Sequence, residues 1–358
     1  MILAAARTYP SGSEGAVQLW GYTKVFRVPK SEFETIMLEN VRRERRVRAI
    51  AYPQKTLLRP VVIDGTGLHS GAGIHMVLHP AEADRGVIFR RTDLVPQGRD
   101  ISDIPATYHH VVDTTLSTVI GNAAGTKVGT IEHLMSAFSV LGIDNVLVEI
   151  DGPEVPVLDG SSEIFIGKIE AAGLEKLDAP RKAIRILKPV IVEDGVKRAA
   201  LRPGDGFRVS FEIDFDNPLI GRQAIDADLH DAFFAEDIMR ARTFCLRRDI
   251  EAMWAAGLAK GGSLDNAVVV DDDRIVNEEG LRYEDEFVRH KVLDAVGDLS
   301  LSGLPLIGRY DGVRAGHAMN NRVLRALMAD RSAWEVVDFT QGRRAQPVHR
   351  ELVAIPAD

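Results

Sequence analysis

The sequence predicts an α+β protein made of two modules with similar element order. At 358 residues, the chain exceeds the usual size of a single domain. Segments that alternate apolar and polar residues, as strands do, are intermixed with segments of helical periodicity and do not alternate strictly with them. After a linker around Asp178–Arg181 the same kinds of segment occur again, although the two halves share no convincing sequence repeat.

Composition narrows the classes of function. A net charge of −8 argues against general affinity for nucleic acid, so we expect no nucleic-acid partner. The only cysteine, Cys245, excludes an intrachain disulfide and a thiolate metal cage; a metal site would need His and carboxylates. No apolar run approaches the roughly 20 residues that span a bilayer, and Arg7 interrupts the first one. We therefore expect a cytoplasmic protein without stable membrane insertion.

Residues 1–53 differ from the rest and are treated as an N-terminal extension. The segment ENVRRERRVR places five arginines between positions 42 and 48, in what we expect to be a short helix. One interpretation is contact with RNA or anionic lipid. The other, favoured because no aromatic or Gly-rich stretch accompanies the arginines, is a disordered extension or sequence upstream of a true start near Met37.

The first module is predicted over residues 54–178. Gly and Asn in GNAAGT predict a hairpin turn. Helical periodicity marks TIEHLMSAFSVLG, with Thr130 as the expected N-cap, and EIFIGKIEAAGL. Alternation predicts antiparallel strands in VVIDGTGLHSG, IHMVLHP and GVIFRR, and DNVLVEI is expected to be a further strand.

The second module is predicted over residues 182–340, followed by a tail over 341–358. Its helices are expected in DIEAMWAAGLA, between residues 284 and 301, and in NNRVLRALMAD. Its strands are expected in RILKPVIVEDG, FRVSFEIDFDN, VVV and LIGRYDG.

The segment EDEFVRHKVLDAVGDLSLSG carries the most informative polar pattern. On a helix His290, Asp294 and Asp298 lie at i, i+4 and i+8 and form one stripe with apolar flanks. A His and a carboxylate one turn apart can chelate a metal. Taken alone, this spacing fits a surface His–Asp pair without a ligand better than it fits a metal site.

Glu132 and His133 strengthen the metal interpretation. Zinc hydrolases place a carboxylate beside a ligand, where it can take a proton from water. A capped helix start would explain Glu132 but not His133. His317, just before a predicted helix, fits a packed or capping residue, and His75, His79, His109 and His110 on strand-like segments are interpreted as structural. H-E-x-x-H is absent, which argues against a zincin protease.

These segments, in this order, resemble the UDP-3-O-acyl-N-acetylglucosamine deacetylase family, the zinc enzymes of lipid A biosynthesis. The resemblance covers about residues 54–345. It implies two modules, each a β-sheet with two helices, packed face to face around the active site. The matching segments are GTGLHSG, DTTLST, GTIEHLMSAFSVLGIDN, PEVPVLDGSS, ARTFCL, GGSLDNAVVVDD, EDEFVRHKVLDAVGDL and GHAMNN. Ser117 departs from relatives that carry Cys there, and Arg314 from a common Lys.

The resemblance implies a role for each matching residue. His133, His290 and Asp294 are the implied metal ligands, for Zn²⁺ with Fe²⁺ as the alternative. Glu132 is the implied general base, and His317 the cation that stabilises the oxyanion and protonates the amine. Asp298 would orient His317, and the hydroxyl of Thr243 would help hold the carbonyl oxygen. The implied substrate-binding residues are Lys291 near the diphosphate, Phe215 and Phe244 near the nucleotide, His69 in its loop, and Leu264, Ala267 and Val269 along the acyl passage.

The resulting expectation is a monomeric deacetylase whose partner is a small-molecule acylated UDP-sugar. It would hydrolyse the 2-acetamido group of UDP-3-O-(3-hydroxyacyl)-N-acetylglucosamine. Two alternatives remain: a sugar-nucleotide-binding protein without catalysis, and an added RNA- or membrane-binding role of the arginine segment.

Overall fold

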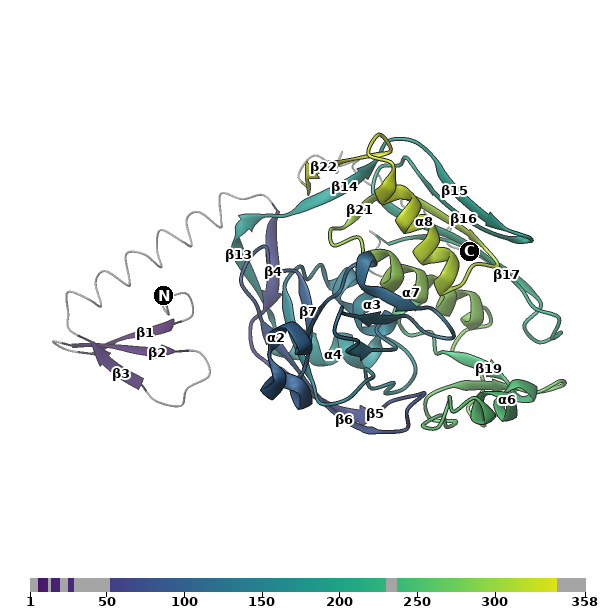
Figure 1. The fold of residues 1–358 in the computed structure, drawn as a ribbon, viewed down its shortest axis with the longest axis horizontal. Coiled ribbons are helices and arrows are strands. Elements are labelled where there is room, and N and C mark those ends of the chain that lie inside the picture. The colour runs from purple at the N-terminus through teal and green to yellow at the C-terminus, as the bar shows by residue number, and fades with distance from the viewer. Residues whose placement is uncertain (1–5, 12–13, 20–24, 29–51, 230–236, 340–358) are drawn as a thin grey trace, which may run out of the picture.

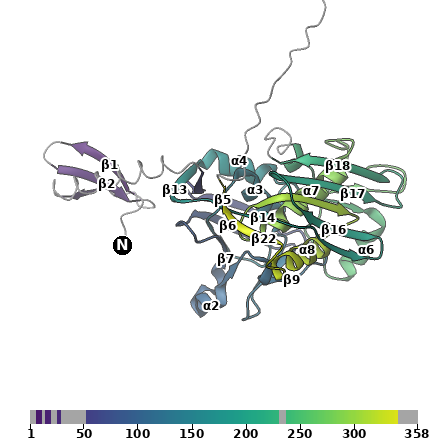
Figure 2. The same ribbon diagram turned by 90° about the horizontal axis from the view of Figure 1, so that it is seen from above.

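The computed structural model describes residues 6–11, 14–19, 25–28, 52–229 and 237–339. Strands and helices are intermixed, which confirms the α+β class (Figure 1). In the view from above, β17 (Phe207–Asp214) and β18 (Arg222–Asp228) lie at the opposite side of the body from α2 (Arg99–Ser102) (Figure 2). None of the helices among the described residues is long and apolar enough to cross a membrane.

The first half contains a five-stranded sheet with the order β5-β6-β12-β7-β8. Its strands are β5 (Val61–Thr66), β6 (Gly73–Pro80), β7 (Val87–Arg91), β8 (Asp103–Pro105) and β12 (Val146–Ile150). Strand β12 inserts between β6 and β7, antiparallel to β6 and parallel to β7, so β5, β6 and β7 alternate in direction as predicted. A long connection from β7 to β12 makes this parallel pairing feasible.

Smaller sheets complete the first half. The predicted hairpin at GNAAGT is confirmed, since β10 (Val119–Gly121) pairs with β11 (Lys127–Val128) and, on its other side, with β9 (Val111–Asp113). Strand β4 (Pro53–Leu57) pairs with β13 (Leu174–Pro180). The segment predicted as a linker thus includes the end of β13 and leads directly into β14. Short helical turns lie at η1 (Thr92–Gln97), α2 (Arg99–Ser102) and η2 (Tyr108–His110).

The second half contains the larger sheet, with the order β15-β16-β21-β14-β22, and β17 pairing with both β18 and β21. A separate parallel pair joins β19 (Phe244–Leu246) to β20 (Val268–Val270), with η3 (Arg247–Asp249) and α6 (Ile250–Ala255) between them in sequence. The strands of the large sheet are β14 (Lys182–Ile186), β15 (Val190–Asp194), β16 (Lys197–Arg202), β17 (Phe207–Asp214), β18 (Arg222–Asp228), β21 (Leu306–Val313) and β22 (Trp334–Asp338).

Two helices from each half lie in the body: α3 (Glu132–Leu141) and α4 (Glu163–Ala172), α7 (Glu286–Ser300) and α8 (His317–Ala329). Helices α3 and α7 pack side by side in its centre (Figure 1). A Cβ on Gly297 would lie 2.1 Å from the carbonyl oxygen of Glu132, so only glycine permits this close approach. The hydroxyl of Ser136 donates to the carbonyl of Leu293, which adds a polar link across the same contact.

Thr130 does not cap α3, so the N-cap prediction is wrong. Ile131 holds the N-cap position, and the Thr130 hydroxyl instead donates to Glu154 Oε1 at 2.8 Å. Glu154 also accepts from the backbone N–H groups of His69 and Ser70. This buried carboxylate therefore joins the GLHSG loop to the chain that enters α3, and a local capping pattern does not reveal such a long-range partner.

Strands β1 (Ala6–Ser11), β2 (Glu14–Leu19) and β3 (Val25–Val28) form an antiparallel sheet within the N-terminal extension. The sequence analysis expected disorder or an upstream start there. Thr8, Tyr9, Val17 and Val25 are residue types that favour strands, a signal that the analysis did not use. The arginine segment between positions 42 and 48 and the tail over 341–358 lie outside the described residues.

Candidate metal centre and acid–base site

Three buried donor atoms converge between α3 and α7. Asp294 Oδ1 lies 3.6 Å from His133 Nε2 and 3.4 Å from His290 Nε2. Ligand atoms at about 2.1 Å from a tetrahedral ion would lie about 3.4 Å apart. Among the described residues Asp294 Oδ1 has no hydrogen-bond partner, although it is buried. Mutual distances, burial and the unpartnered oxygen all fit a divalent metal ion held by His133, His290 and Asp294.

Neighbouring groups hold two of the proposed ligands, His290 and Asp294, in place. The Nδ1 atom of His290 lies 3.0 Å from the carbonyl oxygen of Ala241, so Nδ1 carries the proton and Nε2 keeps its lone pair. Burial lowers the pKa of His290 to about 3, which leaves the ring neutral as a ligand must be. The second oxygen of Asp294 accepts from Lys291 Nζ at 2.7 Å, so Oδ1 is the oxygen that faces the histidines.

Glu132 and His317 face each other beside the ligands. Glu132 Oε1 lies 3.8 Å from His317 Nε2, and His317 Nε2 lies 4.0 Å from Asp294 Oδ2. Burial raises the pKa of Glu132, which suits a group that must take up a proton. Burial disfavours charge on His317, but Asp298 and Glu132 outweigh it and raise the pKa of His317 to about 9. His317 is thus a cation at neutral pH.

Asp298 is the centre of a buried polar network that orients His317. Its Oδ2 accepts from His317 Nδ1 and from Asn320 Nδ2, both at 2.8 Å. Tyr310 Oη in turn donates to Asn320 Oδ1. Every member is buried, so the network is held with little contact to water.

Thr118 links the base to this network and was missed by the sequence analysis. Its backbone N–H donates to Glu132 Oε2 at 3.0 Å, and its hydroxyl donates to Asp298 Oδ1 at 2.5 Å. One residue therefore hydrogen-bonds to both buried carboxylates, Glu132 and Asp298. Thr118 ends the segment DTTLST, which served only as a match to the family, and Asn320 and Tyr310 carried no signal of their own.

The predicted nucleotide-side residues form one contact group. The Nζ atom of Lys291 lies 5.7 Å from the ring centroid of Phe244, and Phe215 meets Phe244 edge-on with centroids 5.6 Å apart. Phe244 also contacts His290, with centroids 6.3 Å apart. Cationic Lys291 thus lies between the metal centre and a pair of half-buried aromatic rings.

The other predicted substrate residues lie nearby in looser positions. His69 Nε2 is buried without a partner among the described residues, and burial lowers the pKa of His69. Thr243 follows the Ala241 carbonyl by two residues and donates its N–H to Gly160. Of the three predicted acyl-passage residues, Ala267 and Val269 are buried, while Leu264 is exposed.

The stripe predicted on α7 is confirmed, because His290, Asp294 and Asp298 are all buried. The surface-pair interpretation is therefore wrong for this helix. His75, His79, His109 and His110 lie outside the metal-ligand group, as expected. His75, for example, pairs with Asp64 on the exposed face of β5 and β6.

A separate crevice of about 1180 Å³ lies on the other side of α3 and α7. Met135 and Phe138 of α3 and Val296 and Leu299 of α7 line it, whereas none of the proposed metal ligands does. It therefore plays no part in the chemistry derived for the metal centre.

Comparison with known proteins agrees with this geometry. The family described as UDP-3-O-acyl N-acetylglycosamine deacetylase matches residues 54–329. A protein of Teredinibacter turnerae named UDP-3-O-acyl-N-acetylglucosamine deacetylase is 51% identical over 294 residues, covering 82% of this chain and 95% of its own. Proteins of the same name from Phenylobacterium zucineum and Pseudomonas entomophila are each 50% identical, covering 80% and 84% of this chain and 97% and 98% of their own.

Proposed function

The chain belongs to the UDP-3-O-acyl-N-acetylglucosamine deacetylase family, and from this premise we propose that it hydrolyses the 2-acetamido group of UDP-3-O-(3-hydroxyacyl)-N-acetylglucosamine. The products are the free amine and acetate, in the committed step of lipid A biosynthesis. The observation that carries the proposal is the convergence of His133, His290 and Asp294 within reach of Glu132 and His317.

Zinc is the metal we propose for the three ligands, with Fe²⁺ as the alternative, because two histidines and a carboxylate suit both ions. When bound, the ion acts as a Lewis acid that polarises the amide carbonyl and makes water more acidic. Lys291 keeps one Asp294 oxygen occupied, and the Ala241 carbonyl keeps His290 Nε2 free.

The remaining chemistry belongs to side chains of this chain. Glu132 accepts a proton as the water oxygen bonds to the amide carbon. Cationic His317 stabilises the charge that develops on the carbonyl oxygen, together with Thr243. His317 then gives its proton to the nitrogen as the C–N bond breaks. Asp298 keeps Nδ1 of His317 occupied, so the proton leaves from Nε2, the atom that faces Glu132.

The substrate would extend from this centre in two directions. We propose that Lys291 pairs with the diphosphate and that Phe215 and Phe244 contact the nucleotide, since Phe244 contacts both Lys291 and Phe215. His69, whose backbone N–H donates to Glu154, would contact the substrate from its loop. The acyl chain would pass Leu264, Ala267 and Val269, of which Leu264 lies exposed at the open end.

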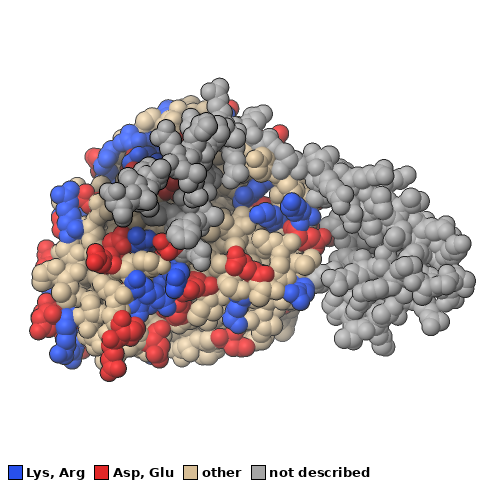
Figure 3. Space-filling view, turned by 180° about the vertical axis from the view of Figure 1, so that it is seen from behind, with Lys and Arg blue, Asp and Glu red and all other residues tan. Residues whose placement is uncertain are grey.

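We further propose that the enzyme is a cytoplasmic monomer built from modules 54–178 and 182–340. Figure 3 shows acidic and basic side chains interspersed on one face of the molecule, which supports the expectation that nucleic acid is not a partner. Size-exclusion chromatography with light scattering tests the oligomeric state. Deletion of residues 1–52, followed by assays of acetate release and of RNA and vesicle binding, tests whether the extension has a function of its own.

A metal-and-activity assay tests the proposed function. Wild type should hold one divalent ion per chain and release acetate from the acylated UDP-sugar. Glu132→Ala should retain the ion but lose about 100- to 10,000-fold in kcat, as expected for loss of a general base. His290→Ala should bind the ion weakly. A wild type that binds the acylated UDP-sugar but releases no acetate would instead be a binding protein.

A further inference from the structure

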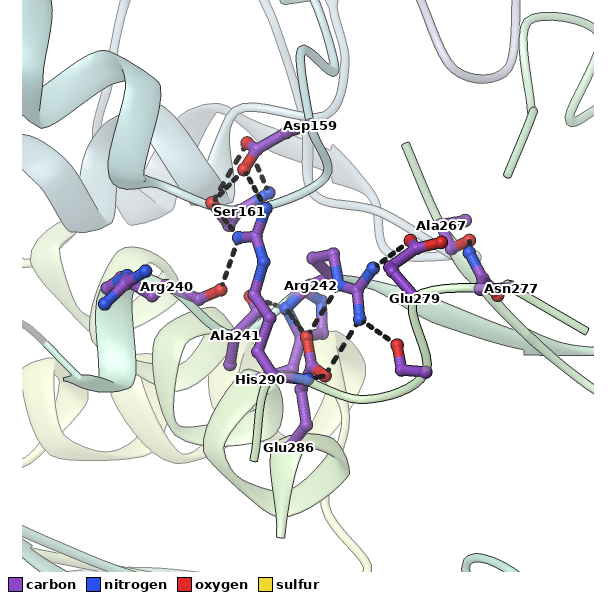
Figure 4. A network of polar contacts seen from close by, with 12 residues as sticks. Asp159, Ser161, Arg240, Ala241, Arg242, Ala267, Asn277, Glu279, Glu286 and His290 are labelled. Carbon is purple, nitrogen blue, oxygen red and sulfur yellow. Dashed lines mark hydrogen bonds and ion pairs between the residues drawn. The ribbon is translucent and has the colours of Figure 1, made fainter. Parts of the chain in front are cut away.

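A single peptide unit, the one between Ala241 and Arg242, is held at both ends by helix α7. Its carbonyl oxygen, on Ala241, lies 3.0 Å from Nδ1 of His290. Its N–H, on Arg242, donates to Glu286 Oε1 at 2.9 Å. Glu286 and His290 are four residues apart, so they lie one turn apart on the same helix. The orientation of this peptide plane is therefore fixed relative to the proposed metal ligand (Figure 4).

Glu286 is well satisfied in this position although it is fully buried. Its Oε1 accepts from the backbone N–H and from Nε of Arg242, both at 2.9 Å. Its Oε2 accepts from the backbone N–H of Arg282 at 2.6 Å and from Arg242 Nη2 at 3.2 Å. Removing one member of such a pair leaves a buried charge without compensation, which is strongly unfavourable.

Arg242 completes the arrangement from the other side. Figure 4 shows its guanidinium pointing to Glu279 on one side and to Glu286 on the other. The Nη1 atom donates to Glu279 Oε1 and the Nη2 atom to the carbonyl of Gly280, both at 2.7 Å. Only 4% of its surface is exposed, and the planar group uses its donors in several directions at once. Lysine has no group of that shape.

The same segment is tied to the loop of the first half that supports His133. Thr243 donates its N–H to the carbonyl of Gly160, and Ser162 donates its N–H to the carbonyl of Met239. The hydroxyl of Ser162 donates to the carbonyl of His133 at 2.7 Å. The chain around Arg242 therefore contacts His290 directly and is connected to the backbone of His133 through Ser162.

We propose that Arg242 and Glu286 are positioning residues for the metal centre. They hold the Ala241 carbonyl where it accepts the Nδ1 proton of His290, which fixes the tautomer and the ring orientation that direct Nε2 to the metal. The inference rests on the proposed role of His290 as a ligand. An ion pair that served stability alone would weaken the fold when removed, but it would not change the metal affinity of the folded protein.

The test compares four purified variants with wild type: Glu286→Ala, Glu286→Gln, Arg242→Met and, as a matched control, Arg90→Met. Arg90 is also buried and bidentate, bonded to Asp103 at 2.7 and 2.8 Å, but it lies on β7 in the other half. For each protein, the zinc dissociation constant is measured by competition with a chelator, and the melting temperature is measured without metal.

We expect Glu286→Ala and Arg242→Met to bind zinc about 10- to 100-fold more weakly than wild type, the usual effect of losing a group that orients a ligand. Glu286→Gln keeps an oxygen for the Arg242 N–H and Nε, so its loss should be smaller than that of Glu286→Ala. Arg90→Met should melt at a lower temperature with zinc affinity within about 2-fold of wild type, because it touches no ligand.

Two outcomes overturn the inference. In the first, both Glu286 variants bind zinc as tightly as wild type. In the second, the Glu286 and Arg242 variants lose no more zinc affinity than Arg90→Met does. The Gln variant keeps the test decisive if Glu286→Ala or Arg242→Met does not fold. Acetate release by wild type separates the two proposals. If wild type releases acetate and the variants bind zinc as tightly as wild type, only the positioning role is rejected. If the variants bind zinc more weakly but wild type releases no acetate, only the proposed function is rejected.

Discussion

His290 and His317 are two buried imidazoles at the same candidate metal centre, yet His290 is neutral and His317 is a cation at neutral pH. The pKa of His290 falls to about 3, because burial dominates and its Nδ1 partner is the neutral carbonyl of Ala241. The pKa of His317 rises to about 9, because carboxylates outweigh burial and its Nδ1 partner is Asp298. The group that accepts the Nδ1 hydrogen bond thus distinguishes a metal ligand from an acid.

This contrast predicts that replacing His317 affects turnover and leaves metal binding in place. His317→Ala should keep zinc with nearly the wild-type affinity, because His317 is not among the three converging donors. Its kcat should fall by about 100- to 1000-fold, the usual loss for an oxyanion donor. Zinc content and acetate release measured on the same preparations check both parts. Loss of zinc from His317→Ala would break the comparison.

The pH profile of wild type gives the second test. His317 is charged below its pKa of about 9, so kcat/KM should decline as pH rises through about 9. Glu132 must be ionised and burial raises its pKa, so the acidic decline should lie above the range of an ordinary carboxylate. The raised pKa of His317 also contributes stability, fully present below its unfolded pKa of about 6.5 and lost as pH rises through about 9. A profile without an alkaline decline would contradict the acid role.

Asp298→Asn sharpens the same comparison by changing only the partner of His317. With a neutral partner, as His290 has, the pKa of His317 should fall toward the ordinary histidine range. The alkaline decline of kcat/KM should move to lower pH, and kcat at pH 8 should drop about 10-fold while kcat at low pH changes less. Zinc affinity serves as the control, since Asp298 is not among the three converging donors. An unchanged alkaline limb would show that Asp298 does not set the charge on His317.

Thr118→Val should have the smallest effect. Valine keeps the backbone N–H that donates to Glu132 but removes the hydroxyl that donates to Asp298. Asp298 retains its bonds to His317 and Asn320, so we expect a loss of about 3- to 10-fold in kcat, in line with the roughly 0.5–1.5 kcal/mol that one hydrogen bond typically contributes. Thr118→Ser, which restores the hydroxyl, should recover most of the activity. Equal losses in both variants would indicate a packing defect.

The sequence pattern predicted the stripe on α7 because helical geometry fixes which residues share a face. The role of its residues in metal binding came from the family resemblance. A correct helix assignment was enough to place three of the residues on one face, namely His290, Asp294 and Asp298. A predicted helix start was enough to single out Glu132 and His133. Thr118 could not be found this way, since its hydroxyl meets Asp298 across 180 positions of sequence. Such partners depend on how the two halves dock, which no local period encodes.

Two features of the first half depend on distant neighbours. Thr130 had the residue type of an N-cap, but it lies one residue before the N-cap, has a positive φ of 54° and donates its hydroxyl to Glu154. The parallel pairing of β12 with β7 depends on insertion of a later strand between earlier ones. In both cases the local sequence pattern predicted the helix or strand correctly but contained no information about its partner far away in the sequence.

The close approach at Gly297 has a consequence for how far this protein can be altered. Because main-chain atoms of α3 and α7 meet there, the minimum spacing of the helices that carry Glu132 and Asp294 does not depend on side-chain volume. Exchange of one aliphatic residue for another elsewhere in the core can then raise or lower thermal stability without bringing these helices closer. Thermostabilising substitutions elsewhere in the core therefore leave this minimum spacing of the two helices unchanged.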